Sequence, residues 1–500
     1  MKVLKTNSSP FVNFNQKISF LFDGKKIFGF KGDTIASALL RNNINLVGRS
    51  FKYHRPRGIY TCGIEEPNAL VQIISEYSEP NTRATIKKIY EGMEVESQNR
   101  WPSLDNDIGS INSLFSPLFS AGFYYKTFMG PHKSFWKKIY EPIIRRAAGL
   151  GKPPKEFKAL SSHLHHNVDI VIVGAGLNGL LAAKSLINTN HDILLVDFDN
   201  HLGGIINNSA KISSIDNQSP QEWVKSTVEA IEKSKNIKIL KNTLVTTYNY
   251  INHLIAVEDK HVGSRPSENK VNNILHKIRT DHVILCNGHI ERFLSFQNND
   301  LPGIMLASSF EKYICRYGTL PSKEPVIFSN NSNSNSLIYS IINQGYKPKA
   351  YIDSRSGENI EPELFDLIRK HDIPLYTNSQ IKSVSGGKRI EKILIEDSTG
   401  GLSEIHSDFL CVSGGINPDV HLFTQSKGLL DWDEKDLTYK PSKPFQPTIT
   451  LGSASGQFNL EKVSDEINEK LKIFKNKVLD TQIVLNTKES YQIEKLWEIS

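Results

Sequence analysis

Cysteine is scarce in this 500-residue sequence, which has only four. They stand far apart, at Cys62, Cys286, Cys315 and Cys411, so no C-x-x-C pair is available for a redox disulfide and no set has the spacing of a zinc site. Widely separated free thiols are typical of a reducing compartment. We therefore expect four reduced cysteines in a cytoplasmic protein, with no metal-binding residues.

Long apolar runs are also missing. No stretch of 18 apolar residues predicts a transmembrane helix, and the first residues, MKVLKTNSSPFVNFNQ, lack the apolar core that a secretory signal needs. The net charge of +7, from 60 Lys and Arg against 53 Asp and Glu, is modest, and no basic stripe with interleaved aromatic residues is present. These features argue against membrane and nucleic-acid partners, and the length predicts two to four domains.

The N-terminal region, residues 11–80, has the pattern of a β-grasp fold. Two short strands flank Asp23-Gly24, a hairpin turn signal, and GDTIASALLRNN follows with Asp33 or Thr34 as a helix N-cap. The segment NALVQIIS then predicts a further strand. Ferredoxin-type domains with this order hold iron–sulfur through four cysteines. Cys62 is the one cysteine of the region, which raises the question of what a cluster fold does without a cluster.

Residues 81–166 are rich in aromatic residues, and Pro and Gly interrupt every candidate helix or strand. We interpret them as an arm that packs its aromatic side chains on the rest of the chain or on a partner, followed by a linker. Three histidines, His163, His165 and His166, follow directly. Because no carboxylate stands at ligand spacing in this polar linker, we do not expect them to hold a metal.

The strongest motif is VDIVIVGAGLNGLLAAKSLINTNHDILLVDFD, residues 168–199. A buried strand leads into a glycine turn and a helix, and a second strand ends on Asp197. Gly174 permits the tight turn, Gly176 lets the backbone approach a pyrophosphate, and Gly179 lets helix and strand pack closely. The helix N-terminus favours the anion, and Asp197 can accept hydrogen bonds from a ribose diol. The segment therefore predicts dinucleotide binding.

Further glycine turns support a fold with two dinucleotide-binding domains, like that of disulfide reductases. The segment HLGG follows the acid, and apolar strands enter glycine turns at Gly288, Gly414-Gly415 and Gly452-Ser453. In flavoproteins of this fold the last strand usually ends in Gly-Asp, whose carboxylate meets the flavin's ribityl side. Ser453 stands there instead, which favours NAD over FAD. We assign residues 167–318 and 405–475 to this NAD-binding domain.

Residues 319–404 contain a second β-α-β pattern, in EPVIFSN, SLIYSIINQGY and KPKAYIDS. Between its first strand and its helix the sequence is NNSNSNS, with no glycine where a pyrophosphate would lie. We expect this half to keep the fold and to have lost its nucleotide. A chain with one dinucleotide site and no redox disulfide is not a self-contained reductase. Residues 476–500 are assigned to a C-terminal tail.

Several motifs resemble the alpha subunit of heterotetrameric sarcosine oxidase. They are YHRPRGIYTCGIEEPNALV, VGAGLNG, HLGG, GHIERFLSFQNNDLPGIMLA and VSGGINPDVHLFTQSKG, and the resemblance covers residues from about 12 to 500. It implies a β-grasp domain without a cluster and a Rossmann domain with bound NAD. It also implies a beta subunit that carries FAD and FMN, and gamma and delta subunits. That complex oxidises sarcosine to glycine with oxygen and tetrahydrofolate, giving hydrogen peroxide and methylenetetrahydrofolate.

The resemblance also assigns roles to single residues. Asp197 would hold the adenosine ribose beside Phe198, and Ser453 would approach the nicotinamide end. No residue of the chain is assigned a catalytic role. The residues expected to line the phosphates or wrap the cofactor are Gly174, Ala175, Gly176, Asn178, Gly179, Gly204, Ile205 and Gly288.

The family's alpha subunit usually continues into an aminomethyltransferase-like half that binds folate, and this sequence stops at EKLWEIS, about where that half begins. We expect either a fragment, a separate folate-binding chain, or loss of that half. Two alternatives to the NAD-binding subunit remain open. One is an FAD-containing subunit of an opine or amino-acid dehydrogenase-like complex, and the other is a scaffold with an empty Rossmann site.

Overall fold

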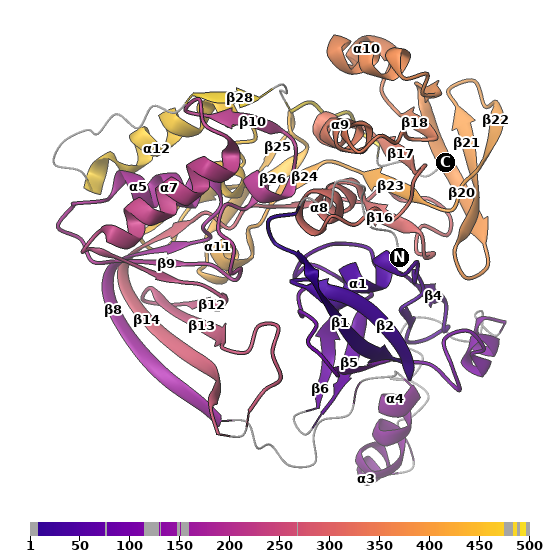
Figure 1. The fold of residues 1–500 in the computed structure, drawn as a ribbon, viewed down its shortest axis with the longest axis horizontal. Helices are drawn as coiled ribbons and strands as arrows, with labels where there is room; N and C mark the ends of the chain where they lie inside the picture. Colours follow the sequence, from indigo (N-terminus) through magenta and orange to yellow (C-terminus); the bar gives the residue numbers. More distant parts are fainter. Residues whose placement is uncertain are drawn as a thin grey trace.

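The computed structural model describes residues 9–75, 78–114, 130, 132–147, 151, 160–267, 269–474, 484–487 and 491–496. Three bodies pack together in it (Figure 1): an N-terminal domain, a first α/β unit and a second α/β unit. Of the predicted aromatic-rich arm and linker, residues 81–166, positions 115–129, 131, 148–150 and 152–159 lie outside the described residues. Among the described residues, no helix has both the length and the apolar character needed to cross a membrane.

The N-terminal domain is a five-stranded sheet with one buried helix. Its hairpin turns at the predicted position, where Asp23 and Gly24 both have positive φ, and Thr34 caps the helix by accepting from the Ser37 amide. One strand of the sheet, Glu79–Arg83, crosses residue 80 and another, Glu94–Ser97, lies beyond it, so the predicted boundary is too early. The sheet order is β2-β1-β7-β5-β6, with β1 Asn13–Phe22, β2 Lys25–Lys31, β5 Leu70–Ile74, β6 Glu79–Arg83 and β7 Glu94–Ser97, and the helix is α1 Ile35–Arg41.

A buried ion pair joins this domain to the second unit. Arg41 and Asp33 have fully buried side chains that lie 3.0 Å apart. Arg41 also donates hydrogen bonds to the carbonyl oxygens of Tyr317 and Gly318, at the end of α8 (Ala307–Tyr317). Breaking a buried pair of this kind leaves an uncompensated charge. The β-grasp domain is therefore held against the α/β body.

The first α/β unit is a seven-stranded sheet whose centre is parallel. Helices α5 (Leu177–Ser185), α7 (Pro220–Lys233) and α12 (Val463–Leu471) lie together over its parallel end (Figure 1). The apolar residues of α5 and of the strand segments beneath it, Ile170–Val173, Ile193–Val196 and Val283–Leu285, are buried, which is typical of parallel sheets. The strand order is β11-β9-β8-β14-β13-β12, with β27 also on β14; the bounds are β8 Leu160–Val173, β9 Ile193–Val196, β11 Ile237–Leu240, β12 Thr243–Asn249, β13 His253–Asp259, β14 Val271–Leu285 and β27 Thr448–Thr450.

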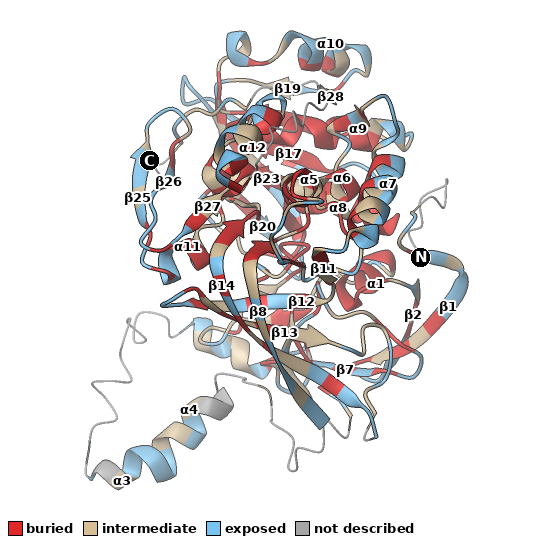
Figure 2. Cartoon of the chain, turned by 90° about the vertical axis from the view of Figure 1, so that its left-hand side faces the viewer, coloured by how far each residue is buried: buried red, intermediate tan, exposed pale blue. Residues whose placement is uncertain are grey.

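Strand β8 begins at Leu160, so the three histidines assigned to the linker lie in a strand. They pair with β14, and His166 Nε2 lies 2.8 Å from His276 Nδ1. The outer end of β8 is exposed or intermediate and that of β14 is mixed, whereas the inner ends of both strands are buried (Figure 2). The polar alternation of the outer end concealed this strand, because a half-exposed ribbon lacks the apolar run of a parallel core strand. No group of metal-ligating side chains occurs among the described residues.

The second α/β unit is a five-stranded parallel sheet with a three-stranded antiparallel sheet beside it. Strands β16 and β23 and helix α8 belong to this unit, although their sequence positions were assigned to the first. Short buried strands have similar apolar patterns, and the pattern does not specify which sheet a strand joins. The order is β16-β23-β17-β18-β19, with β16 Ile304–Leu306, β17 Val326–Ser329, β18 Ala350–Asp353, β19 Leu375–Tyr376, β23 Leu410–Ser413, α9 Asn335–Asn343, α10 Pro362–Lys370, β20 Ser379–Gly386, β21 Ile390–Asp397 and β22 Leu402–His406.

Short elements link the two units. Strand β15 (His289–Glu291) leaves the first sheet and pairs with β24 (Ile416–Pro418), which leaves the second. The described parts of the tail dock on the body rather than leading away from it. Residues Leu485–Thr487 form β28 against β10 (Ile212–Ile215), and residues 491–496 lie on the second unit. The hairpin of β25 (Leu429–Asp433) and β26 (Thr438–Lys443) completes this region.

Candidate dinucleotide-binding site

Two glycines of the first turn are required by packing alone. Gly174 has φ +94°, and a Cβ there would lie 2.4 Å from the carbonyl oxygen of Cys286. A Cβ on Gly179 would lie 1.8 Å from the carbonyl oxygen of Gly174. No side chain fits at such distances, so the helix α5 approaches the ends of β8 and β14 closely. The sequence reading of both residues as structural glycines agrees with this geometry.

Gly176 is different, because its surroundings are open. The nearest atom to a Cβ built there is the Cα of Gly204, at 3.8 Å. Gly204 belongs to the HLGG turn, which lies against the glycine turn through a hydrogen bond of 2.8 Å from Gly203 N to Ala175 O. Ile205 follows as the first residue of α6 (Ile205–Asn208). The two turns form a cradle of backbone at the N-terminus of α5, and such a terminus favours an anion.

Asp197 lies at the end of β9, beside this cradle. Its carboxylate accepts hydrogen bonds from the amides of Ala175, at 2.5 Å, and Asp199, at 2.7 Å. Burial raises the pKa of Asp197 to about 6, although both amides favour its ionised form. The carboxylate thus ties the glycine turn to the end of β9. Each oxygen keeps a further lone pair with which a ribose hydroxyl could be held.

An ion pair that sequence reasoning missed lies beside Asp197. Arg316, on α8 of the second unit, lies 2.6 Å from an Asp199 oxygen. Burial alone would raise the pKa of Asp199, but Arg316, the His201 amide and Lys312 together outweigh it, and the pKa lies below its usual value. The ring of Phe11 lies 5.1 Å from the Arg316 guanidinium and contacts His201 edge-on. No sequence signal joins these residues, because they come from three separate parts of the chain.

The other predicted residues lie at the far side of the same sheet edge. Gly288 has φ +89°, and a Cβ there would meet nothing within 4 Å. Gly452, the neighbour of Ser453, packs on the Asn178 side chain, which a Cβ on Gly452 would approach to 2.0 Å. The side-chain oxygens of Asn178 and Asn287 are buried and have no hydrogen-bond partner among the described residues. Open glycines and unpartnered polar atoms fit a polar ligand at this edge.

A carboxylate does approach the turn after β27, but it is already engaged. Glu466 of α12 accepts from the Gly452 amide at 2.7 Å and pairs with Lys470 at 2.7 Å. Glu466 therefore caps the first residue of the short helix η6 (Gly452–Ser455). Phe198, which lies two residues after the end of β9, is 43% exposed. Its ring is therefore accessible to a ligand bound beside Asp197.

The N-terminal domain does not have the residues for an iron–sulfur cluster. A 2Fe–2S cluster needs four ligands, and Cys62 is the one cysteine in residues 1–285. Cys62 is buried, and burial raises its thiol pKa to about 11. A thiol with such a pKa is a packing residue at neutral pH.

Comparisons with known proteins agree with this organisation. The model of the 2Fe-2S iron-sulfur cluster binding domain matches residues 15–100, and that of the NAD(P)-binding Rossmann-like domain matches residues 172–227. The L-proline dehydrogenase of P. horikoshii superposes with a TM-score of 0.61 at 18% identity, over 95% of this chain and 77% of that one. The fold is thus confirmed: a ferredoxin-like domain followed by a nucleotide-binding two-unit Rossmann fold.

Sequence relatives define the resemblance further. The chain is 38% identical over 458 residues to the sarcosine oxidase subunit alpha of Rhizobium meliloti (strain 1021), covering 90% of this chain and 45% of the relative. It is 25% identical over 455 residues to that of Corynebacterium sp. (strain U-96), covering 89% and 42%. The resemblance to sarcosine oxidase alpha subunits is confirmed, and the chain spans less than half the length of these relatives.

Proposed function

We propose that the chain is the NAD-binding alpha-type subunit of a sarcosine oxidase-like complex. In this proposal a beta-type subunit carries FAD and FMN and oxidises the amine, with gamma and delta subunits beside it. The complex would act in the cytoplasm, converting sarcosine, oxygen and tetrahydrofolate into glycine, hydrogen peroxide and methylenetetrahydrofolate. The 38% identity to a sarcosine oxidase subunit alpha over most of the chain supports this proposal.

The chain's own residues would bind and orient the nucleotide rather than catalyse. The first turn of α5 and the Gly203-Gly204 turn would hold the pyrophosphate, and Asp197 would accept from the adenosine ribose. Asn178, Gly288 and Ser453 would lie toward the nicotinamide end. Bound NAD could supply a hydride acceptor, and we assign no catalytic residue in this chain.

The turn that follows β27 is the feature that favours NAD over FAD. Ser453 follows Gly452 where an Asp would meet a flavin, and the nearest carboxylate, Glu466, is held by the Gly452 amide and Lys470. A flavin would therefore find no free carboxylate for its ribityl hydroxyls at this turn. This supports an adenine dinucleotide without a flavin.

The test is the identity of the released nucleotide. The chain is co-expressed with a beta-type partner, purified, denatured, and its nucleotides are identified by mass spectrometry. We expect one NAD per chain, with flavin on the partner, and sarcosine oxidation only in the complex. FAD released from this chain alone would refute the proposal and favour the dehydrogenase-like alternative. Release of no nucleotide from a complex that still assembles would favour a scaffold.

A further inference from the structure

The turn of the second unit repeats the geometry of the first with other residues. The last residue of β8 is Val173 and that of β17 is Ser329. Counted from these residues, Ser332 corresponds to Gly176 and Asn335 to Gly179. In the first unit this turn faces open space at Gly176. In the second unit the turn is covered by the chain's own residues 491–496.

Backbone hydrogen bonds hold this covering segment in an extended conformation. The Ser332 amide donates to the Gln492 carbonyl at 2.9 Å, and the Glu494 amide donates to the Asn330 carbonyl at 3.0 Å. Asn331 and Ile493 are thereby bridged in antiparallel fashion. Side chains add to this pairing, because Asn330 Nδ2 donates to the Glu494 carbonyl at 2.8 Å and Asn359 Nδ2 donates to its carboxylate. The pairing is that of a short extended segment added by main-chain hydrogen bonds to a turn whose residues are buried.

The remaining amides of the turn are also satisfied within the chain. The Asn331 amide donates to Ser329 Oγ at 3.1 Å, and the Asn333 amide to Asn331 Oδ1 at 2.8 Å. The Asn330 amide donates to the Ser413 carbonyl at 3.4 Å. By the same count the amides of Asn330 and Asn331 correspond to those of Gly174 and Ala175, which are also engaged within the chain in the first unit. The amides of Ser332 and Asn333 are therefore the ones that a pyrophosphate would need at this turn. A phosphate here would have to displace internal acceptors.

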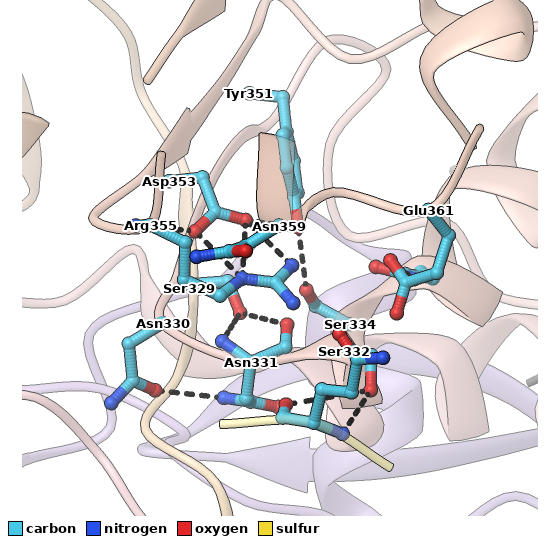
Figure 3. A network of polar contacts seen from close by, with 12 residues as sticks. Ser329, Asn330, Asn331, Ser332, Ser334, Tyr351, Asp353, Arg355, Asn359 and Glu361 are labelled. Atoms are coloured by element: carbon cyan, nitrogen blue, oxygen red, sulfur yellow. Dashed lines mark hydrogen bonds and ion pairs between the residues drawn. The ribbon is translucent and has the colours of Figure 1, made fainter. Parts of the chain in front are cut away.

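The acid at the end of the second strand is engaged as well (Figure 3). Asp353 is the last residue of β18, one position before the place that Asp197 has after β9 in the first unit, and Arg355 Nε and Nη2 bind its two oxygens at 3.0 and 2.9 Å. The Tyr351 hydroxyl donates to the same carboxylate at 3.2 Å. Both members of the ion pair are buried, with 1% and 0% of their side chains exposed. A ribose diol would therefore find this acceptor occupied.

The covering segment is also anchored at its two ends. The Tyr491 hydroxyl accepts from the Ile416 amide at 3.1 Å, and its ring packs on Phe458. A Cβ on Gly415 would lie 2.4 Å from Ile493 Cδ1. The Gly414-Gly415 turn, assigned from sequence to the cofactor, thus makes room for this segment at Gly415. Lys495 pairs with Glu434 at the other end.

From these contacts we propose that the second unit is a peptide-binding site, in which residues 491–496 occupy the place of a dinucleotide. The chain therefore holds one dinucleotide, in the first unit, whichever dinucleotide that is. Through these contacts, residues 491–496 lie against the second unit and against the β15–β24 link. The inference goes beyond the proposed function and stands or falls separately from it.

Hydrogen–deuterium exchange on the full chain tests this proposal. The amides of Gln492 and Glu494 report the docked state, since the first donates to Ser332 Oγ and the second to the Asn330 carbonyl. We expect both to be protected, with protection unchanged by millimolar NADH or NADPH. We also expect titration to saturate at one dinucleotide per chain. A second equivalent bound to the intact chain, or exchange at both amides as fast as in an unfolded peptide, would overturn the proposal.

A substitution at Ser332 links the protection to the turn. Ser332→Pro removes the amide that donates to Gln492, at the first position of the short helix η4 (Ser332–Ser334), where proline is accommodated and where Asn331 is already extended. We expect exchange at Glu494 to rise about fivefold or more, the loss that one hydrogen bond produces. Ser332→Ala, which keeps the amide, is the matched control and should leave Glu494 closer to the parent value. Unchanged exchange at Glu494 in the proline variant, with β17 still protected, would contradict the docking.

Discussion

The two α/β units of this chain place a strand, a turn and a helix in the same order, yet their turns differ in what they face. At the first turn, Gly176 and Gly288 border open space and Asn178 keeps an unpartnered oxygen. At the second turn, the backbone amides and Asp353 are satisfied by the chain itself, while side-chain atoms of Asn335 and Arg355 are buried without a partner among the described residues. The second turn has side chains where the first has glycines, and these side chains fill the space that a phosphate needs. The same turn forms internal hydrogen bonds instead.

The largest expected effect comes from the ion pair that occupies the second unit. Arg355→Met removes the partner of a fully buried carboxylate, and we expect the free energy of unfolding to fall by about 3–5 kcal/mol. Urea denaturation measures it. Arg389→Met, which breaks an exposed pair with Asp408, is the matched control and should cost about 0–1 kcal/mol. Equal losses in the two variants would show that the Asp353 pair does not differ from a surface pair.

Exchanging residues between the turns sharpens the comparison. Gly179→Asn places a Cβ against the Gly174 carbonyl, and we expect a loss of about 3 kcal/mol in unfolding free energy, at the upper end for overpacking. Asn335→Gly removes a hydrogen bond to Glu361 and adds a flexible residue at the start of α9, so we expect about 1 kcal/mol. Thermal and urea unfolding of both variants decide whether the first turn is the more constrained one.

Asp197 makes stability depend on pH in a direction opposite to most carboxylates. Because its folded pKa of about 6 lies above the ordinary value of 3.8, the folded protein binds more protons than the unfolded chain between these values. Its contribution to stability is therefore present below pH 4 and is lost as pH rises toward 6, by roughly 2–3 kcal/mol. Urea unfolding at pH 4, 5, 6 and 7 should show this loss in the parent and not in Asp197→Asn. A parallel pH profile for the two proteins would contradict the raised pKa.

Gly176→Ala should have the smallest effect on stability and a clear effect on nucleotide binding. Gly176→Ala adds a methyl group where the fold has room, so we expect unfolding to change by less than about 1 kcal/mol. The methyl group would occupy the approach of a pyrophosphate, and we expect nucleotide affinity to fall about tenfold or more, about 1.4 kcal/mol. Nucleotide retained per chain after dialysis measures it. Gly387→Ala, in open space on the β20–β21 turn, is the matched control.

Much of the first site was predictable because its signal is local. Gly174, Gly176, Gly179 and Asp197 lie within one strand–turn–helix–strand unit, where steric rules act between close neighbours in sequence. Arg316, Phe11 and Glu466 were not predictable, since they reach the site from distant segments. The early boundary at residue 80 and the misplaced strands β16 and β23 have the same cause, because strand pairing is decided by partners that the local pattern does not specify.

The sequence by itself determined the ferredoxin-like order of the N-terminal domain, its lack of cluster ligands, and one glycine turn suited to a dinucleotide. It also showed that the second turn lacks glycine. Only the tertiary structure decided what fills that turn. Residues 491–496 pair with Asn330–Ser332 because the folded body brings the two segments together. Hydrogen bonds between segments so far apart in sequence form only when packing offsets the entropic cost of closing the loop between them.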